Sequence, residues 1–248
     1  MSLTLAIPSK GRLKEQTEEF FARAGFPIES VGGARGYLAR IARLPEIEVR
    51  LMSAGEIASA VIAGEVHVGV SGEDLLREQA GDLERVVHLL APLGFGRADL
   101  VVAVPASWLD VETMADVDDV GARLEARSGH KLCVATKYVR STRRFFTAEG
   151  VGHYRIVESA GATEGAPTAG TAELIVDITT TGATLRSNGL KILRDGLIVA
   201  SQAQLAGSME ATWSPEALRA LGTLVAALEP GPEKGVRFDR FRLALAAR

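Results

Sequence analysis

The sequence has few of the features that would place it in several common protein classes. It contains one cysteine, Cys133, in 248 residues, so no disulfide can form within the chain and a reducing compartment is expected. The first apolar run, Leu3 to Pro8, is followed closely by Lys10 and Arg12, so it is too short for an export signal or a membrane span. We therefore expect a cytoplasmic protein.

The sequence also lacks a basic excess. The formal net charge is -3 and the isoelectric point is about 5.9, which argues against a broad surface for nucleic acid or anionic membrane. An anionic ligand must then be bound by a local site. The four histidines are His67, His88, His130 and His153. No zinc site is expected, because none of them has a metal-ligand spacing to another or to Cys133.

Hydrophobic side chains make up 47% of the chain, enough for one large or two modest domains. Short β-type runs alternate with helical stretches, which is typical of an α/β protein. The clearest predicted strands are 3–7, 66–70, 100–104, 131–135 and 173–178, and the clearest predicted helices are 13–24, 56–63, 185–193 and 215–228. The stretch 229–235 is rich in Pro and Gly and predicts an irregular connection before a basic terminal segment.

The most informative unit is the predicted strand 173–178 with the loop Thr179 to Thr184 that follows it. A loop between a strand and a helix presents backbone N–H groups at the positive end of the helix, where phosphate can bind. Gly182 permits a tight turn, and the threonine hydroxyls supply further donors. Asp177 suits ribose hydroxyls or a hydrated cation rather than phosphate. The same residues also suit strand ends and helix caps, so the loop alone does not specify a reaction.

Neither of two common nucleotide motifs is present. The loop does not match Gly-x-x-x-x-Gly-Lys-Ser/Thr, and Gly-x-Gly-x-x-Gly is missing from the strand-to-helix turns. Glu164, Gly170 and Ala172, followed by the run 175–178 and by Thr181, Gly182, Thr184 and Leu185, instead resemble the signature of the ATP phosphoribosyltransferase catalytic chain. Further stretches resemble the same family in the same order: 10–13, 69–76, 93–97, 135–138 and 142–144.

This resemblance implies two α/β domains of the periplasmic-binding-protein type (type II) around a cleft. Gly94 to Gly96 is a plausible first crossing between them, and a return near 184–188 gives residues 1–96 plus 186–248 for domain I and 97–185 for domain II. The implied reaction joins N1 of ATP to the sugar of phosphoribosyl pyrophosphate, the first step of histidine biosynthesis, with Mg²⁺ on the pyrophosphate.

The resemblance also assigns substrate residues. Phosphoribosyl pyrophosphate is expected at Asp177, Thr179, Thr180, Thr181, Gly182, Ala183, Thr184 and Glu164, and either Glu164 or Asp177 is a candidate magnesium contact. No covalent nucleophile is required, because adenine N1 supplies the lone pair. The candidates for ATP or pyrophosphate are Lys10, Gly11, Arg12, Arg35, Asp74, Arg97, Lys137 and Arg143.

The chain departs from the family pattern where many members carry an arginine before Asp-Ile-Pro. It reads Met52 to Ala58 there, and Arg50 is a possible replacement charge. About forty-five residues follow Gln202, too few for the extra regulatory domain of the long form. The resemblance therefore implies the short form, a homodimer that assembles with a regulatory subunit similar to histidyl-tRNA synthetase.

Two other functions remain open from the sequence. A different phosphoribosyltransferase would carry a similar phosphate loop, although many of those have two adjacent acids where Asp177 has Val176 and Ile178 as neighbours. A non-catalytic two-domain ligand-binding module would share the implied fold, because a fold does not determine a function.

Overall fold

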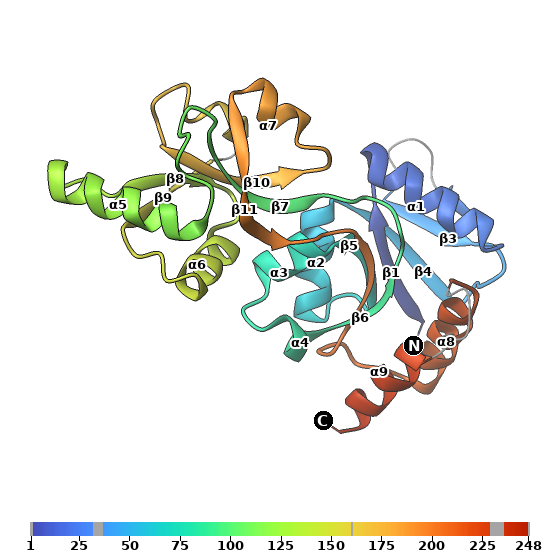
Figure 1. Cartoon of the computed structure of the whole chain (residues 1–248). Coiled ribbons are helices and arrows are strands. Elements are labelled where there is room, and N and C mark those ends of the chain that lie inside the picture. The colour runs from blue at the N-terminus through green and yellow to red at the C-terminus, as the bar shows by residue number, and fades with distance from the viewer. Residues whose placement is uncertain (1, 32–36, 160, 229–235, 248) are drawn as a thin grey trace. The chain divides into compact units, whose positions relative to one another are not determined.

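A computed structural model describes residues 2–31, 37–159, 161–228 and 236–247. The chain forms two compact units, and Figure 1 follows it through both. Unit 1 comprises Met1–Gly96 and Gln202–Arg248, and unit 2 comprises Arg97–Ser201. The chain therefore leaves unit 1 once, builds unit 2 from one continuous segment, and returns.

Unit 1 is built on a seven-stranded sheet in the order β2-β3-β4-β1-β5-β12-β6. β1 lies parallel to β4 and β5, whereas β12 is antiparallel to both of its neighbours. The strands are β1 (Leu3–Pro8), β2 (Ile28–Val31), β3 (Leu38–Ile41), β4 (Ile47–Met52), β5 (Val68–Gly72), β6 (Val87–Pro92) and β12 (Ala203–Ser208).

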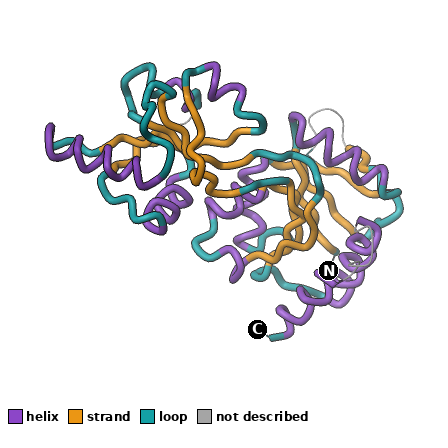
Figure 2. Tube along the Cα trace, in the orientation of Figure 1, coloured by secondary structure: helices purple, strands orange, loops and turns teal. Residues whose placement is uncertain are grey.

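Helices cover both faces of this sheet, as the purple and orange segments of Figure 2 show. One apolar cluster joins the sheet to Phe21, to α8 and to Phe241 of α9, and the other joins it to α2 and α3. The helices are α1 (Gly11–Arg23), α2 (Ala54–Ala63), α3 (Glu73–Gln79), α4 (Leu83–Val86), α8 (Pro215–Leu228) and α9 (Val236–Ala246). Among the described residues, no helix is both long and apolar enough to span a bilayer.

Unit 2 has a five-stranded sheet in the order β11-β7-β10-β8-β9. β8, β9 and β10 are parallel, and β7 is antiparallel to β10 and β11. The elements are β7 (Asp99–Pro105), α5 (Met114–Ser128), β8 (Leu132–Thr136), α6 (Val139–Ala148), β9 (Tyr154–Glu158), the 3-10 turn η1 (Thr163–Gly165), β10 (Leu174–Thr179), α7 (Ala183–Ser187) and β11 (Leu190–Val199).

The two units share one strand order. In each unit the first parallel strand of the chain lies between the second and the third, and an antiparallel strand and then a last strand follow the third. The orders are β4-β1-β5-β12-β6 in unit 1 and β9-β8-β10-β7-β11 in unit 2. In each unit the antiparallel strand comes directly after a crossing from the other unit. The expected architecture of two α/β domains is confirmed, and unit 1 carries the antiparallel pair β2-β3 as an addition to the shared strand order.

Two expectations require correction. The predicted helix 185–193 is wrong: α7 ends at Ser187, Gly189 takes a left-handed φ of 71°, and β11 begins at Leu190. A left-handed glycine ends a helix, and the apolar residues beyond it pair with β7 instead of continuing the helical face. For the same reason the return crossing lies after Ser201 rather than after Leu185, because β11 belongs to the sheet of unit 2.

Candidate active site

The loop between β10 and α7 is a tight turn stabilised by its own hydroxyl groups. Gly182 has a φ of 70°, a conformation that favours glycine, and its N–H donates to Thr179 Oγ1 over 2.8 Å. The N–H of Ala183 donates to Thr181 Oγ1 over 3.3 Å. Each of these hydroxyls accepts from the backbone and retains its own hydrogen, so both can still donate to a ligand.

The start of α7 adds backbone donors to this loop. The first helical hydrogen bond runs from the Arg186 N–H to the Gly182 carbonyl over 3.0 Å. The N–H groups of Thr184 and Leu185 precede it and have no acceptor within the helix. The Thr180 hydroxyl differs, because it donates to the Arg97 carbonyl over 3.1 Å and so ties the loop to the residues just before β7.

These residues line a cavity of about 290 Å³ within unit 2. Seven of the eight residues predicted for phosphoribosyl pyrophosphate are among its walls, and the eighth, Gly182, is buried in the turn. Glu164 reaches the cavity from η1, although it lies far from the loop in sequence. The lining residues are Ala98, Glu164, Asp177, Ile178, Thr179, Thr180, Thr181, Ala183, Thr184 and Leu185.

Asp177 is the half-buried carboxylate of this cavity. Burial raises its pKa, and the negative charge of Glu164 acts in the same direction. The N–H of Ile178 donates to its Oδ1 over 2.8 Å, and this bond and the charge of Lys137 partly oppose the rise. Lys137 is near because β8 and β10 are parallel neighbours, whose carboxyl ends lie at one edge of the sheet.

Sequence reasoning missed Thr163, which is 3% exposed, donates its hydroxyl hydrogen to Ser159 Oγ over 3.0 Å and acts against the raised pKa of Asp177. Its neighbour Ala162 has a φ of 50°, the one positive φ at a non-glycine position among the described residues. No periodicity or motif pointed to either residue. The one available signal was a hydroxyl directly beside Glu164.

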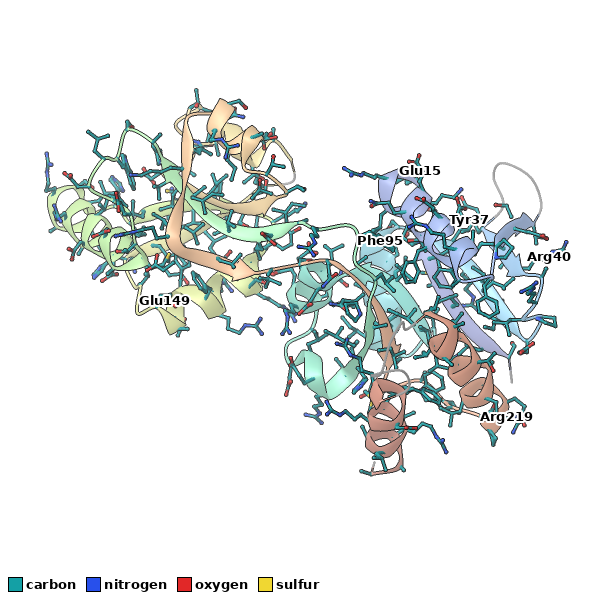
Figure 3. The ribbon with its side chains drawn as sticks, turned by 45° about the vertical axis from the view of Figure 1, so that its right-hand side comes forward. Glu15, Tyr37, Arg40, Phe95, Glu149 and Arg219 are labelled. Carbon is teal, nitrogen blue, oxygen red and sulfur yellow. The ribbon has the colours of Figure 1, made fainter. Side chains whose placement is uncertain are left out.

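Unit 1 contains a larger cavity of about 630 Å³. Lys10, the N-cap residue of α1, lines it together with Arg50 of β4, whose Nε donates to Glu48 over 2.8 Å. Tyr37, labelled in Figure 3, also lines it and is 78% exposed. Two cationic side chains and an aromatic ring therefore line one cavity. The remaining lining residues are Ser9, Leu38, Leu51, Met52, Ser53, Glu56, Ala60, Glu65 and Val66.

The other predicted contacts are scattered. Gly11, with a φ of 73°, and the exposed Arg12 form the first turn of α1 without lining either cavity. Arg97 and Arg143 are exposed in unit 2, and Asp74 is only 6% exposed within the first turn of α3. Asp74 is not an N-cap, since Gly72 holds that position. Arg35 lies outside the described residues.

A resident metal ion does not fit the protein side chains alone. Within the described ranges, no group of three or more His, Cys, Asp or Glu side chains is arranged to hold one. The 290 Å³ cavity offers two carboxylates, Asp177 and Glu164. This suits an ion whose ligands are supplied mostly by substrate phosphates and water, as is common for Mg²⁺.

Comparison with known proteins agrees with this chemistry. The family model for ATP phosphoribosyltransferase matches residues 53–229. An ATP phosphoribosyltransferase of Caulobacter vibrioides is 60% identical over 227 residues, which is 92% of this chain and 71% of that protein. One from Nitrobacter winogradskyi is 58% identical over 213 residues, covering 86% of this chain and 66% of the relative. The chain thus spans about two thirds of the length of these curated relatives.

A solved structure supports the fold. An ATP phosphoribosyl transferase (HisG:HisZ) complex from Thermotoga maritima aligns with 99% of this chain and 98% of its own, with a TM-score of 0.65 and 23% identity. The sequence matches assign the family, whereas the structural match supports the fold alone. The family model covers most of the chain and includes both η1 and the β10-α7 loop. The chain belongs to the ATP phosphoribosyltransferase family, the pentosyltransferases of the first step of histidine biosynthesis.

Proposed function

We propose that this chain binds phosphoribosyl pyrophosphate in the 290 Å³ cavity of unit 2 and transfers its phosphoribosyl group to N1 of ATP. The observation that carries the proposal is the meeting of a donor-rich turn and two carboxylates in that cavity. Donors suit the 5-phosphate, and carboxylates suit the ribose hydroxyls. A phosphorylated sugar presents both kinds of group a few ångströms apart.

The donors divide between the backbone and the side chains. The N–H groups of Thr184 and Leu185 and the hydroxyls of Thr181 and Thr184 would bind the 5-phosphate. Thr179 would contribute mainly by holding the Gly182 turn. The Thr180 hydroxyl donates to Arg97, so Thr180 would contribute through its backbone.

The transfer forms the bond between adenine N1 and C1 of the ribose while the bond from C1 to the pyrophosphate oxygen breaks. Pyrophosphate leaves with that electron pair, so positive charge grows on the sugar and negative charge on the leaving oxygen. Asp177 and Glu164 would stabilise the first through the ribose, and Lys137, whose charge acts on Asp177, would assist the second. Orienting the two substrates in line supplies much of the remaining rate.

Mg²⁺, carried by the pyrophosphate, would act as a Lewis acid on the leaving group. Asp177 and Glu164 are the residues of the cavity that can contact its water shell. Lys10 and Arg50 of the 630 Å³ cavity in unit 1 would bind the phosphate chain of ATP, with Arg50 in place of the arginine that many relatives carry further along this segment.

The partners and the compartment belong to the same proposal. The Thermotoga maritima structure is a complex of a HisG chain with a HisZ chain. We extend that pairing to this chain, as a short-form catalytic subunit and homodimer that binds a histidyl-tRNA-synthetase-like regulatory subunit. The buried free thiol of Cys133 supports a reducing, cytoplasmic setting.

The direct test is formation of phosphoribosyl-ATP from ATP, phosphoribosyl pyrophosphate and Mg²⁺, with and without the regulatory subunit. We expect product that depends on both substrates. Turnover of a free purine or pyrimidine base in place of ATP would instead indicate another phosphoribosyltransferase. Binding of substrate with no product under either condition would indicate a ligand-binding module.

A further inference from the structure

The strands β2 and β3 form a part of unit 1 that has no counterpart in unit 2. The shared strand order begins at β4 in unit 1 and at β9 in unit 2, and β2 and β3 lie beyond β4. Tyr37 directly precedes β3, and its carbonyl accepts from the Leu51 N–H of β4 over 2.8 Å. The next residue, Leu38, lies opposite Arg50 in the β3-β4 register. The addition therefore brings Tyr37 and Leu38 to the 630 Å³ cavity.

Tyr37 is the tyrosine whose ring the fold leaves uncovered. It is 78% exposed, whereas Tyr138 is 1% exposed and Tyr154 is half-buried. In the described part of the chain, the Tyr37 side chain makes no hydrogen bond, ring contact or cation contact. An aromatic side chain carries a large apolar surface, and covering that surface is favourable. The Tyr37 ring, at the wall of a cavity, is therefore available to a ligand.

The cavities of the two units differ in the side chains that surround them. The 290 Å³ cavity of unit 2 is lined by hydroxyls and carboxylates, and none of its described lining residues is aromatic. The 630 Å³ cavity of unit 1 is more than twice as large and combines the Tyr37 ring with Lys10 and Arg50. Its apolar walls are Leu38, Leu51, Met52, Ala60 and Val66. A flat aromatic group that carries phosphates suits this combination.

The carboxylates of the unit 1 cavity are compatible with such a ligand. Glu56 and Glu65 line it together with the two cations, so the wall is not uniformly positive. Glu56 Oε2 already accepts from the Ser53 N–H over 2.8 Å, as part of the capping box of α2. A carboxylate repels phosphate, but it accepts a hydrogen bond from the amino group of a base. The phosphates of a nucleotide therefore belong beside Lys10 and Arg50.

We propose that Tyr37 is the residue on which the adenine ring of ATP stacks. Its ring covers one face of the base, while Lys10 and Arg50 bind the phosphate chain. This inference rests on the proposed function, because it names the residue that binds the base in the cavity assigned to ATP. Stacking on an aromatic side chain requires only a flat ring, so Tyr37 contributes affinity for the base and none for free polyphosphate.

The test separates the base from the phosphates. The full chain and its variants are titrated calorimetrically with ATP and, separately, with inorganic tripolyphosphate, and steady-state kinetics gives KM for each substrate. Tyr37→Ala should raise Kd and KM for ATP about tenfold, within the usual range for losing one stacked base. Its Kd for tripolyphosphate and its KM for phosphoribosyl pyrophosphate should stay within about twofold of wild type. Lys10→Met should weaken the binding of both ATP and tripolyphosphate.

Two further variants control for the ring and for exposure. Tyr37→Phe should match wild type within about twofold, because it keeps the ring. Leu243→Ala removes an apolar side chain that is 71% exposed in the same unit and lies outside the cavity, so both KM values should be unchanged. Urea unfolding checks that each variant is folded.

The stacking role is wrong if a folded Tyr37→Ala binds ATP like wild type, or if Tyr37→Phe is impaired as much as Tyr37→Ala. It is also wrong if Tyr37→Ala weakens tripolyphosphate as much as ATP. A changed subunit mass in size-exclusion chromatography, with unchanged ATP binding, would assign the ring to a contact between copies of the chain instead. A wild-type chain that binds ATP through Tyr37 but makes no phosphoribosyl-ATP would overturn the proposed function and leave the stacking role intact.

Discussion

The two units have the same strand order but opposite chemistry after their third parallel strand. In unit 2, β10 runs into hydroxyls and free N–H groups. In unit 1, β5 runs into Glu73 and Asp74, and Glu73 is bound by Arg77 over 2.8 Å and by Gln204 over 2.9 Å. A helix start occupied by carboxylates repels phosphate. The strand order places a helix start at each of these edges, and the residues there decide whether a phosphate can bind.

The loops after the first parallel strands are more alike. β1 is followed by Ser9 and Lys10, and β8 is followed by Lys137. Each lysine lies near a different group: Lys10 lines the 630 Å³ cavity with Arg50, and Lys137 faces Asp177. The repeated fold therefore places one lysine just after the first parallel strand of each unit. The comparison predicts that the two lysines serve different substrates.

The largest effect is expected from Asp177→Asn, which keeps the shape of the side chain but removes the charge from the unit 2 cavity. Its kcat/KM for phosphoribosyl pyrophosphate should fall about 100-fold. Since burial disfavours the ionised form, the free energy of unfolding at neutral pH should not decrease. Asp119→Asn, an exposed carboxylate on α5, is the control. If Asp177→Asn keeps the wild-type kcat/KM for phosphoribosyl pyrophosphate, the Asp177 charge does not contribute to the reaction in the unit 2 cavity.

Gly69→Ala should destabilise unit 1. An added Cβ would lie 2.5 Å from Ile57 Cγ2 and 2.7 Å from Val61 Cγ2, where α2 packs on β5. We expect the free energy of unfolding to fall by about 1–3 kcal/mol in urea titrations, the usual cost of overpacking a core. Gly152→Ala in unit 2, where an added Cβ meets nothing within 4 Å, should change stability by less than about 0.5 kcal/mol. Equal losses in the two variants would contradict this packing.

The lysines can be separated by their substrates. Lys137→Met should raise KM for phosphoribosyl pyrophosphate about tenfold with little change for ATP, and Lys10→Met should do the reverse. Steady-state kinetics with one substrate varied at a time gives both values for each variant. If both variants raise KM for the same substrate, the assignment of a different substrate to each lysine is wrong.

A smaller, pH-dependent effect should come from His67 in unit 1. Its Nδ1 accepts from the Thr4 N–H over 3.1 Å and its Nε2 lies 3.1 Å from the Thr212 carbonyl, an arrangement suited to the neutral ring. Burial lowers its pKa. The unfolded chain then binds the proton more readily, so the stability from neutral His67 is present above about pH 6.5 and is lost as the pH falls below it.

The loss should be less than about 1.4 kcal/mol per pH unit, the limit for one titrating group. Urea titrations between pH 7.5 and 5.5 measure it, and His67→Gln should flatten the pH dependence. His88 in the same unit also has a pKa lowered by burial, so part of the slope should remain in that variant. An unchanged slope would show that His67 does not titrate in this range.

The site in unit 2 was predictable in part, because its main component is continuous in sequence. Strand β10, the glycine turn and the hydroxyls follow each other directly, so local rules were enough to propose a phosphate loop. Thr163 was not predictable, since its burial beside Glu164 depends on the turn at Ala162. The cavity of unit 1 was missed for a similar reason: Tyr37 and Arg50 meet through the antiparallel pairing of β3 with β4.

The helical and parallel parts of the fold were also easier to predict than the antiparallel ones. α2 and α8 carry clear start or stop signals, such as the capping box of Ser53 with Glu56, and α8 begins and ends at the predicted residues. β11 was mistaken for a helix because its apolar residues, 190, 192 and 193, fit both periods over so short a stretch. Its partner β7 lies far away in sequence, so the choice between helix and strand depends on a long-range pairing that local periodicity does not reveal.

The double crossing of the chain determines the order in which the protein can be completed during synthesis. Unit 2 is one uninterrupted stretch of polypeptide, so all of its strands have left the ribosome once Ser201 has emerged. Unit 1 begins first but lacks β12, which lies between β5 and β6, until after that point. The nascent chain therefore carries an incomplete N-terminal sheet, with the edges of β5 and β6 unpaired, throughout the translation of unit 2.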